Sequence, residues 1–226
     1  MSPYLEFLLS PVYTGALHPL HLADLKKYPL SDETIRQQGI RSIPPHTIAQ
    51  LLRFDMPGVT SATLFPFADP AGGWMDHIRM KVFPPLTRET ARGGKKKTET
   101  IKYLQPKASG VRLYFPLATM RAACESMETL WVCEGEKKGL RVAQRDGVPV
   151  VALCGVEGWH AGGSEELLPD FDRIALDGRV VKVVPDGDVE DNPNVARAIW
   201  RFGAALDRRG ARPELVHLPQ HLEAAS

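Results

Sequence analysis

The sequence predicts an α/β fold: a Rossmann-like parallel sheet in the second half of the chain, preceded by a smaller, basic α+β subdomain. Three observations predict it. Strands and helices alternate after about residue 129, those strands are continuous Val, Ile and Leu runs, and lysine and arginine concentrate just before them. We therefore expect a helical N-terminal segment at 1–60, the basic subdomain at 61–128, and the parallel-sheet domain at 129–226, with a C-terminal end that could be truncated.

The N-terminal segment carries signals for short helices. One is expected near 20–27. A second begins after Ser31, a good N-cap residue, and stops near Gly39, which can adopt the left-handed conformation that ends a helix. A third is expected at 46–54, opened by two prolines.

The second segment is predicted to hold strands and a cluster of positive charge. A hairpin-like pair is expected at 62–67 and 74–83, then a polar basic loop at 84–100, further strand pieces at 102–106 and 111–117, and a helix at 118–129. Ten lysine or arginine residues against two glutamates lie between Arg79 and Arg112, whereas the whole chain has a net charge of +1. This asymmetry suits binding of a phosphate backbone, although a solvated loop explains the run 91–100 at least as well.

The third segment alternates between the two kinds of element. Strands are expected at 130–135, 148–155, 179–186 and 212–219, and helices at 136–147, 164–174 and 192–210. In parallel sheets of this kind, ligands bind at the carboxyl ends of the strands.

Acidic residues follow two of these strands. Glu134 comes before Gly135 at the end of the first strand, and Asp186 and Asp188 flank Gly187 after the third. Each acid alone is better explained as a helix cap or a solvated turn. Together they would repel one another unless a hard divalent cation bound them, so we predict that these three acids hold Mg²⁺ or Mn²⁺.

The motifs CEGEKKG and VVPDGD resemble the TOPRIM domain of bacterial-type primases, topoisomerases and some nucleases. The resemblance covers roughly residues 129–219 and implies that Glu134, Asp186 and Asp188 are the catalytic, metal-binding residues. One departure concerns Lys138, which stands where bacterial primases have a further acid. Lys137 and Lys138 open the helix beside the metal edge, and either a solvated face or a phosphate contact explains them.

The segment before this domain resembles the basic subdomain of bacterial-type primases, through its arginine-bearing strands and the run KYL. The resemblance implies phosphate contacts by five basic side chains: Arg79, Lys81, Lys102, Lys107 and Arg112. The whole chain also resembles TOPRIM-like regions of phage and plasmid replication proteins. Together these resemblances imply a primase-type nucleotidyltransferase core in DNA replication. They imply single-stranded DNA and nucleoside triphosphates as partners, with a replicative helicase as a further candidate. The zinc module of primases is missing from this sequence.

Two other functions stay open at this point. A TOPRIM nuclease would use the same acids to orient water, and a non-catalytic binding module of a larger replication or defence protein would need no chemistry. The residue types do not separate synthesis, cleavage and binding. Nor do they give template preference, metal number or oligomeric state.

Other features of the sequence indicate where in the cell the protein is expected. Its three cysteines include no C-x-x-C pair and are expected to be reduced thiols of a cytoplasmic protein. No apolar run reaches membrane-spanning length, so no membrane partner is expected. Trp159, in the loop after the second strand, either anchors that loop or stacks on a base.

Overall fold

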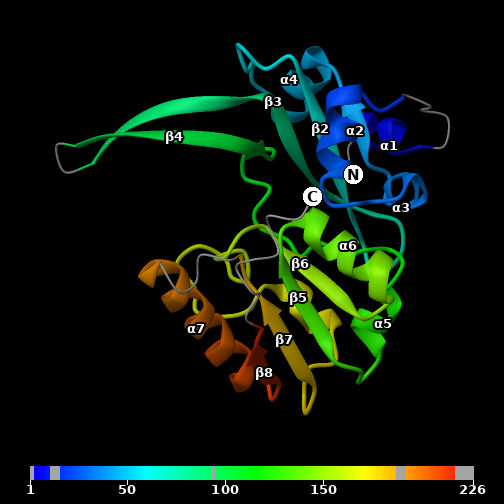
Figure 1. Cartoon of the computed structure of the whole chain (residues 1–226), viewed down its shortest axis with the longest axis vertical. Coiled ribbons are helices and arrows are strands. Elements are labelled where there is room, and N and C mark those ends of the chain that lie inside the picture. Colours follow the sequence, from blue (N-terminus) through cyan, green and yellow to red (C-terminus); the bar gives the residue numbers. More distant parts are fainter. Residues whose placement is uncertain (1–2, 11–15, 93–94, 187–191, 217–226) are drawn as a thin grey trace. The chain divides into compact units, whose positions relative to one another are not determined.

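The computed structural model describes residues 3–10, 16–92, 95–186 and 192–216, and its ribbon is drawn in Figure 1. It divides into two compact units. The first contains residues 1–67 and 74–109, and the second contains 68–73 and 110–226. The first unit has an antiparallel sheet and the second a parallel one, which confirms the predicted fold class.

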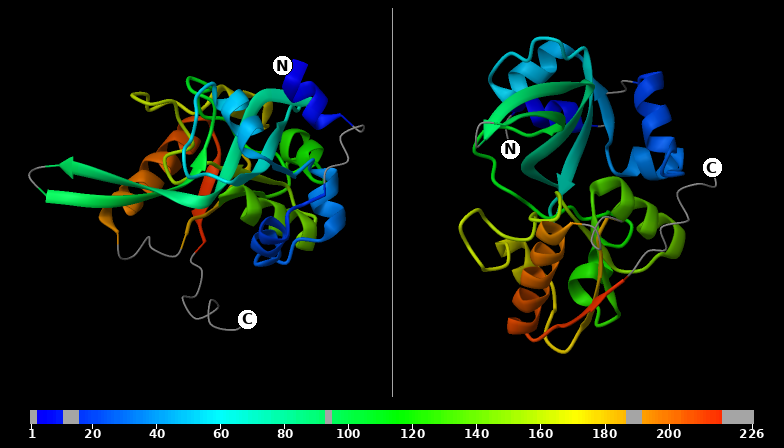
Figure 2. Two further views of the ribbon diagram at one scale, coloured as in Figure 1. Left: turned by 90° about the horizontal axis from the view of Figure 1, so that it is seen from above. Right: turned by 60° about the vertical axis from the view of Figure 1, so that its left-hand side comes forward.

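The first unit is built on a four-stranded sheet in the order β1-β2-β3-β4. Its strands are β1 (Arg41–Ile43), β2 (Ser61–Ala68), β3 (Trp74–Arg92) and β4 (Lys95–Leu104). β2 and β3 are neighbours, as predicted for the pair 62–67 and 74–83. The far half of β3 and β4 forms a two-stranded ribbon that extends beyond the helices of this unit (Figures 1 and 2).

The expectation of a loop at 84–100 is wrong, because β3 and β4 pair through most of this stretch. Thr87 lies opposite Thr100, and Arg88 lies opposite Glu99. The described side chains at 87–89 and 98–100 are all polar and exposed, so this part of the ribbon shows no alternation between apolar and polar positions. The signal that sequence reasoning missed was the cross-strand matching of threonines and opposite charges around two glycines.

Helices cover both faces of this sheet. They are α1 (Pro3–Leu9), α2 (Pro19–Lys26), α3 (Asp32–Gln37) and α4 (Pro45–Leu52). Leu5 of α1 and Ile48 of α4 share a buried cluster with strand residues such as Met80. Ser31 caps α3 as expected, because its hydroxyl accepts a hydrogen bond from the amide of Thr34 at 3.0 Å.

A buried histidine joins α2 to the other face of the sheet. His21 is fully buried, with Nδ1 2.7 Å from the Ser42 hydroxyl and Nε2 2.9 Å from the Ser61 hydroxyl. Its ring stacks on Phe83, with 4.5 Å between centroids. Burial, helped by the charge of His18, lowers the pKa of His21 to about 4, so this contact is made by a neutral ring at neutral pH.

The second unit is built on a parallel sheet in the order β6-β5-β7-β8. Its strands are β5 (Leu130–Glu134), β6 (Val150–Leu153), β7 (Val180–Val184) and β8 (Arg212–Leu215). The crossover helices are α6 (Glu136–Asp146) and α7 (Pro193–Arg208). The two crossovers run in opposite directions along the sheet, and right-handed connections therefore place α6 and α7 on opposite faces, as Figure 1 shows.

Three predicted elements of this unit are shorter than expected. The stretch 111–117 contributes an isolated bridge between Tyr114 and Ala152 in place of a strand. The helix expected at 164–174 is a single 3₁₀ turn, η1 (Pro169–Arg173). The connecting helix is α5 (Met120–Glu125), which is also shorter than the predicted 118–129. No described helix is both long and apolar enough to cross a membrane.

Arg179 is buried at the amino-terminal ends of the two central strands, with about 1% of its surface exposed. Its guanidinium donates hydrogen bonds of 2.7 Å to the carbonyls of Glu128, just before β5, and Ala123, in α5. Weaker contacts reach Ala175, Ala122 and Ser126. Because Arg179 directly precedes β7, its side chain links the start of β7 to the start of β5.

Candidate metal centre

The strand order of the second unit reverses between β5 and β7. From β5 the chain crosses over to β6 on one side, and from β7 it crosses to β8 on the other. Such a reversal leaves a crevice at the carboxyl ends of the two central strands, and this is where open α/β sheets bind ligands. The pairing of Cys133 with Val184 brings those ends to the same edge.

Two of the three predicted acids meet at this edge. Glu134 is the last residue of β5, and Asp186 follows β7 by two residues. The backbone amide of Asp186 donates to Glu134 Oε2 at 3.4 Å, so the acids are neighbours in space although 52 positions separate them in sequence. The third acid, Asp188, lies outside the described residues.

The turn from β5 into α6 depends on glycine at two places. Gly135, the N-cap of α6, has a φ of +88°, which residues with a Cβ rarely adopt. A Cβ on Gly139 would lie 2.9 Å from the Cβ of Ala152 in β6, so the helix packs directly on the strand. These glycines hold the first turn of α6 beside the carboxyl ends of β5 and β6.

Lys138, in that first turn, forms an ion pair with Asp186 through its Nζ and Oδ1 atoms. Both side chains are partly exposed, at 31% for Lys138 and 48% for Asp186. The neighbouring Lys137 and Glu136 are buried, and the Cys154 thiol donates a long hydrogen bond of 3.7 Å to Glu136. The two lysines at the start of α6 therefore differ in burial: Lys137 is buried, whereas Lys138 is partly exposed and pairs with Asp186.

The donor set at this edge fits a hard divalent cation. Glu134 and Asp186 offer carboxylate oxygens, the ligands that Mg²⁺ and Mn²⁺ prefer, and the Lys138 ammonium shows that a cation is accommodated beside Asp186. Within the described part of the chain, no group of three or more His, Cys, Asp or Glu side chains is placed to hold a metal. Mg²⁺ is usually held by one or two carboxylates, with waters or substrate oxygens in the remaining positions.

The basic residues of the first unit fall into two groups. Lys102 and Lys107 are exposed, and the Arg79 guanidinium lies over the Tyr103 ring at 4.5 Å from its centroid. Lys107 also lines a groove of about 720 Å³ between α4 and the segment 106–109. Arginine and lysine side chains bind phosphate oxygens readily, so Arg79, Lys102 and Lys107 stay predicted phosphate ligands.

The other two predicted phosphate ligands have carboxylate partners. Lys81 pairs with Asp24 of α2, and both side chains are largely buried, at 14% and 10% exposure. Arg112, in the second unit, donates from Nε and Nη2 to the buried Asp170, which also accepts the amide of Leu113 at 2.8 Å. The hydrogen bond to Asp170 raises the pKa of Arg112. Both pairs join segments more than 50 residues apart in the sequence, and a phosphate contact by either residue stays a prediction.

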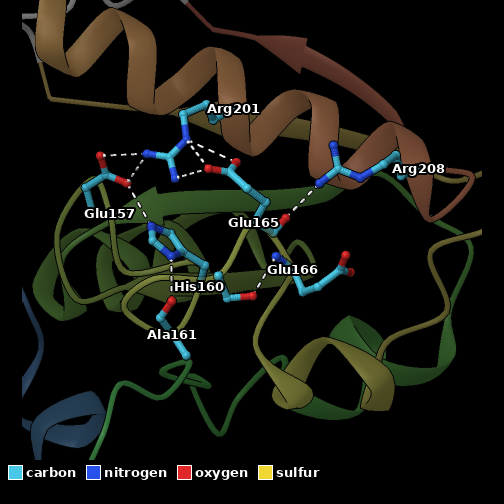
Figure 3. A network of polar contacts seen from close by, with 8 residues as sticks. Glu157, His160, Ala161, Glu165, Glu166, Arg201 and Arg208 are labelled. Carbon is cyan, nitrogen blue, oxygen red and sulfur yellow. Dashed lines mark hydrogen bonds and ion pairs between the residues drawn. The ribbon is translucent and has the colours of Figure 1, made fainter.

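The loop that follows β6 is fastened to α7 by the network in Figure 3. Arg201 of α7 donates to Glu165 at 2.7 Å and contacts Glu157 at 3.4 Å, and Glu157 lies 2.9 Å from Nε2 of His160. Trp159 beneath them is fully buried and stacks on Phe202. Of its two predicted roles, the structure shows the loop anchor.

Sequence reasoning missed the partners of the charged residues. Nothing in the local pattern pairs Arg112 with Asp170 or Lys138 with Asp186, because such contacts depend on which strands become neighbours. Arg179 was missed as well, since it is an arginine preceding an apolar strand and looks like a surface residue.

All three cysteines are free thiols, and Cys133 is buried. Burial raises the pKa of the Cys133 thiol to about 12, which makes it unreactive at neutral pH.

Comparison with known proteins supports the fold. A family model described as a domain of unknown function (DUF3854) matches residues 123–224. Among solved structures, the fold is similar to that of the zinc-binding and RNA polymerase domains of the Aquifex aeolicus primase, with a TM-score of 0.57 and 14% sequence identity. The match covers 90% of this chain and 51% of the primase chain, so this chain spans about half the length of that protein. No curated protein matches the sequence.

Proposed function

We propose that this protein is a metal-dependent, primase-type nucleotidyltransferase core with a TOPRIM domain, acting on single-stranded DNA in phage or plasmid replication. The observation that carries the proposal is the meeting of Glu134 and Asp186 at the strand-order reversal of a parallel sheet. The likeness in fold to a primase supports it, because the primase covers both units of this chain.

In this proposal, each group of residues has one task. Glu134 and Asp186, with Asp188, hold Mg²⁺ or Mn²⁺, and Lys137 and Lys138 lie on the side where the phosphates of a nucleoside triphosphate would approach. The metal ion supplies charge stabilisation at the transferring phosphoryl group. The template lies on the first unit, with Arg79, Lys102 and Lys107 as its phosphate contacts. Lys81 and Arg112, which are bound to carboxylates, hold the surrounding structure in place.

The test is an incubation of the protein with single-stranded DNA, labelled nucleoside triphosphates and Mg²⁺ or Mn²⁺. Labelled oligonucleotides are expected with wild type. Glu134→Gln keeps the shape of the side chain and removes its charge, so product formation should fall at least about a hundredfold, the usual effect of losing one electrostatic contact to a transition state. Glu136→Gln is the matched control, two residues further on, and its buried side chain faces Cys154.

Each alternative gives a different result in the same assay. Shortened DNA without labelled product would identify a nuclease, and binding without either product would identify a non-catalytic module. Equal activity in wild type and Glu134→Gln would place the chemistry elsewhere and reject the proposed centre. A replicative helicase remains a candidate partner, and the cytoplasm is the compartment we expect.

A further inference from the structure

Lys138 stands where a positive charge is unfavourable by itself. It lies in the first turn of α6, an 11-residue helix, and the amino-terminal end of a helix already carries a partial positive charge. The N-cap is Gly135, which has no side chain to accept from the free amides. The carboxylate of Asp186, brought from the end of β7, compensates the ammonium.

This ion pair occupies a carboxylate that the proposed metal centre needs. In the ion-free protein, the Lys138 ammonium is bound to Oδ1 of Asp186, and Glu134 Oε2 accepts the amide of the same aspartate. A divalent cation entering this edge must share Asp186 with the ammonium or displace it. We infer that Lys138 is a tethered counter-ion: it competes with the divalent cation for Asp186 and, once displaced, binds the phosphate group that the cation carries. This inference rests on the proposed function.

The charges favour the second step. The charges of Glu134, Asp186 and Lys138 sum to −1, and one divalent cation reverses this sum to +1. The displaced ammonium is then left beside a cation and a helix amino terminus. A phosphate oxyanion relieves both repulsions at once, and a lysine on a flexible stem can reach it without movement of the helix. The lysine would thereby couple metal binding to phosphate binding.

The competition is tested by titrating the full chain with Mn²⁺ and measuring free Mn²⁺ by electron paramagnetic resonance. Lys138→Met, which removes the ammonium and retains the apolar stem, should bind Mn²⁺ about fivefold more tightly than wild type, the upper end of what a partly exposed ion pair contributes. Lys138→Arg keeps the charge and should resemble wild type. Arg145→Met is the matched control, because it removes one positive charge from α6 about 10 Å further along the helix.

The phosphate step is tested by calorimetric titration of inorganic pyrophosphate into Mn²⁺-saturated protein. Lys138→Met should weaken pyrophosphate binding about tenfold, while Arg145→Met leaves it unchanged. Opposite changes for metal and pyrophosphate in one variant are not expected from a merely structural lysine. Circular dichroism of each variant establishes that it is folded.

The outcomes separate this inference from the proposed function. If Glu134→Gln abolishes Mn²⁺ binding but Lys138→Met binds Mn²⁺ within twofold of wild type, the metal centre stands and the competition is refuted. Pyrophosphate binding that is equal in wild type and Lys138→Met refutes the phosphate step. If neither wild type nor Lys138→Met binds Mn²⁺, the proposed metal centre fails and this inference fails with it.

Discussion

Replacing Arg179 by methionine should destabilise the second unit by about 3 kcal/mol. Methionine retains the apolar stem but removes every donor, so the carbonyls of Ala123 and Glu128 lose their 2.7 Å hydrogen bonds. A buried acceptor left without a partner, as the Ala123 carbonyl would be, costs about 1–3 kcal/mol, and loss of the part-buried hydrogen bond to Glu128 adds about 0.5–1.5 kcal/mol. Burial of the charge offsets part of this loss, since desolvation already lowers the pKa of Arg179.

The assay is urea unfolding followed by tryptophan fluorescence, with three of the four tryptophans located in the second unit. The control is Arg209→Met, which removes an arginine from the same unit whose partner is the exposed Asp172. Such a surface pair contributes less than about 1 kcal/mol. If Arg179→Met shifts the free energy of unfolding no more than Arg209→Met does, the guanidinium does not stabilise the packing of the starts of β5 and β7.

Three further predictions concern other charged groups. Lowering the pH from 7 to 4 should remove about 3 kcal/mol of stability from the first unit. The folded state keeps His21 neutral down to a pKa of about 4, whereas the unfolded chain binds its proton near 6.5. Thermal melts of wild type and His21→Gln across this range check it, and an equal dependence of stability on pH in both would contradict it. Arg112→Met should cost about 3 kcal/mol in urea unfolding, because it leaves the buried Asp170 carboxylate without its cation, and the double variant with Asp170→Asn should be less affected. Changing Lys102 and Lys107 together to glutamine should weaken single-stranded DNA binding, measured by fluorescence anisotropy. The slope of log affinity against log salt should fall by about 1.4, since each lost phosphate contact contributes about 0.7. An unchanged slope would show that neither lysine contacts the DNA backbone.

Much of the fold could be predicted because the apolar residues were distributed clearly. The first three strands of the second unit, β5, β6 and β7, are largely apolar runs, so their order along the chain and their parallel pairing followed from general rules. The ribbon of β3 and β4 could not be predicted in the same way. Its described side chains at 87–89 and 98–100 are polar, and pairing there depends on matched side chains across the strands, as between Arg88 and Glu99.

The same distinction applies to the candidate site: positions set by the order of the strands could be predicted, and side-chain partners could not. Glu134 and Asp186 could be placed at one sheet edge because the end of a parallel strand is a topological position, readable from where an apolar run stops. The partners of Lys81 and Arg112 could not, because the sequence shows only that each is a basic residue on or near a strand. Deciding between a phosphate ligand and an internal ion pair requires knowing which carboxylate faces the side chain, as Asp24 and Asp170 do here.

The contact between Gly139 and Ala152 limits how fast, and by what motion, the acidic edge can respond to an ion. With 2.9 Å between the Cβ of Ala152 and the place of a Cβ on Gly139, α6 has no room to settle closer to β6. If a metal ion replaces the ammonium as proposed, the lysine would move aside by rotation about its own bonds. Rotamer changes of exposed side chains take picoseconds to nanoseconds, whereas helix displacements take microseconds to milliseconds. The movement of the protein would then be on the faster time scale, with the backbone already in place before the ion arrives.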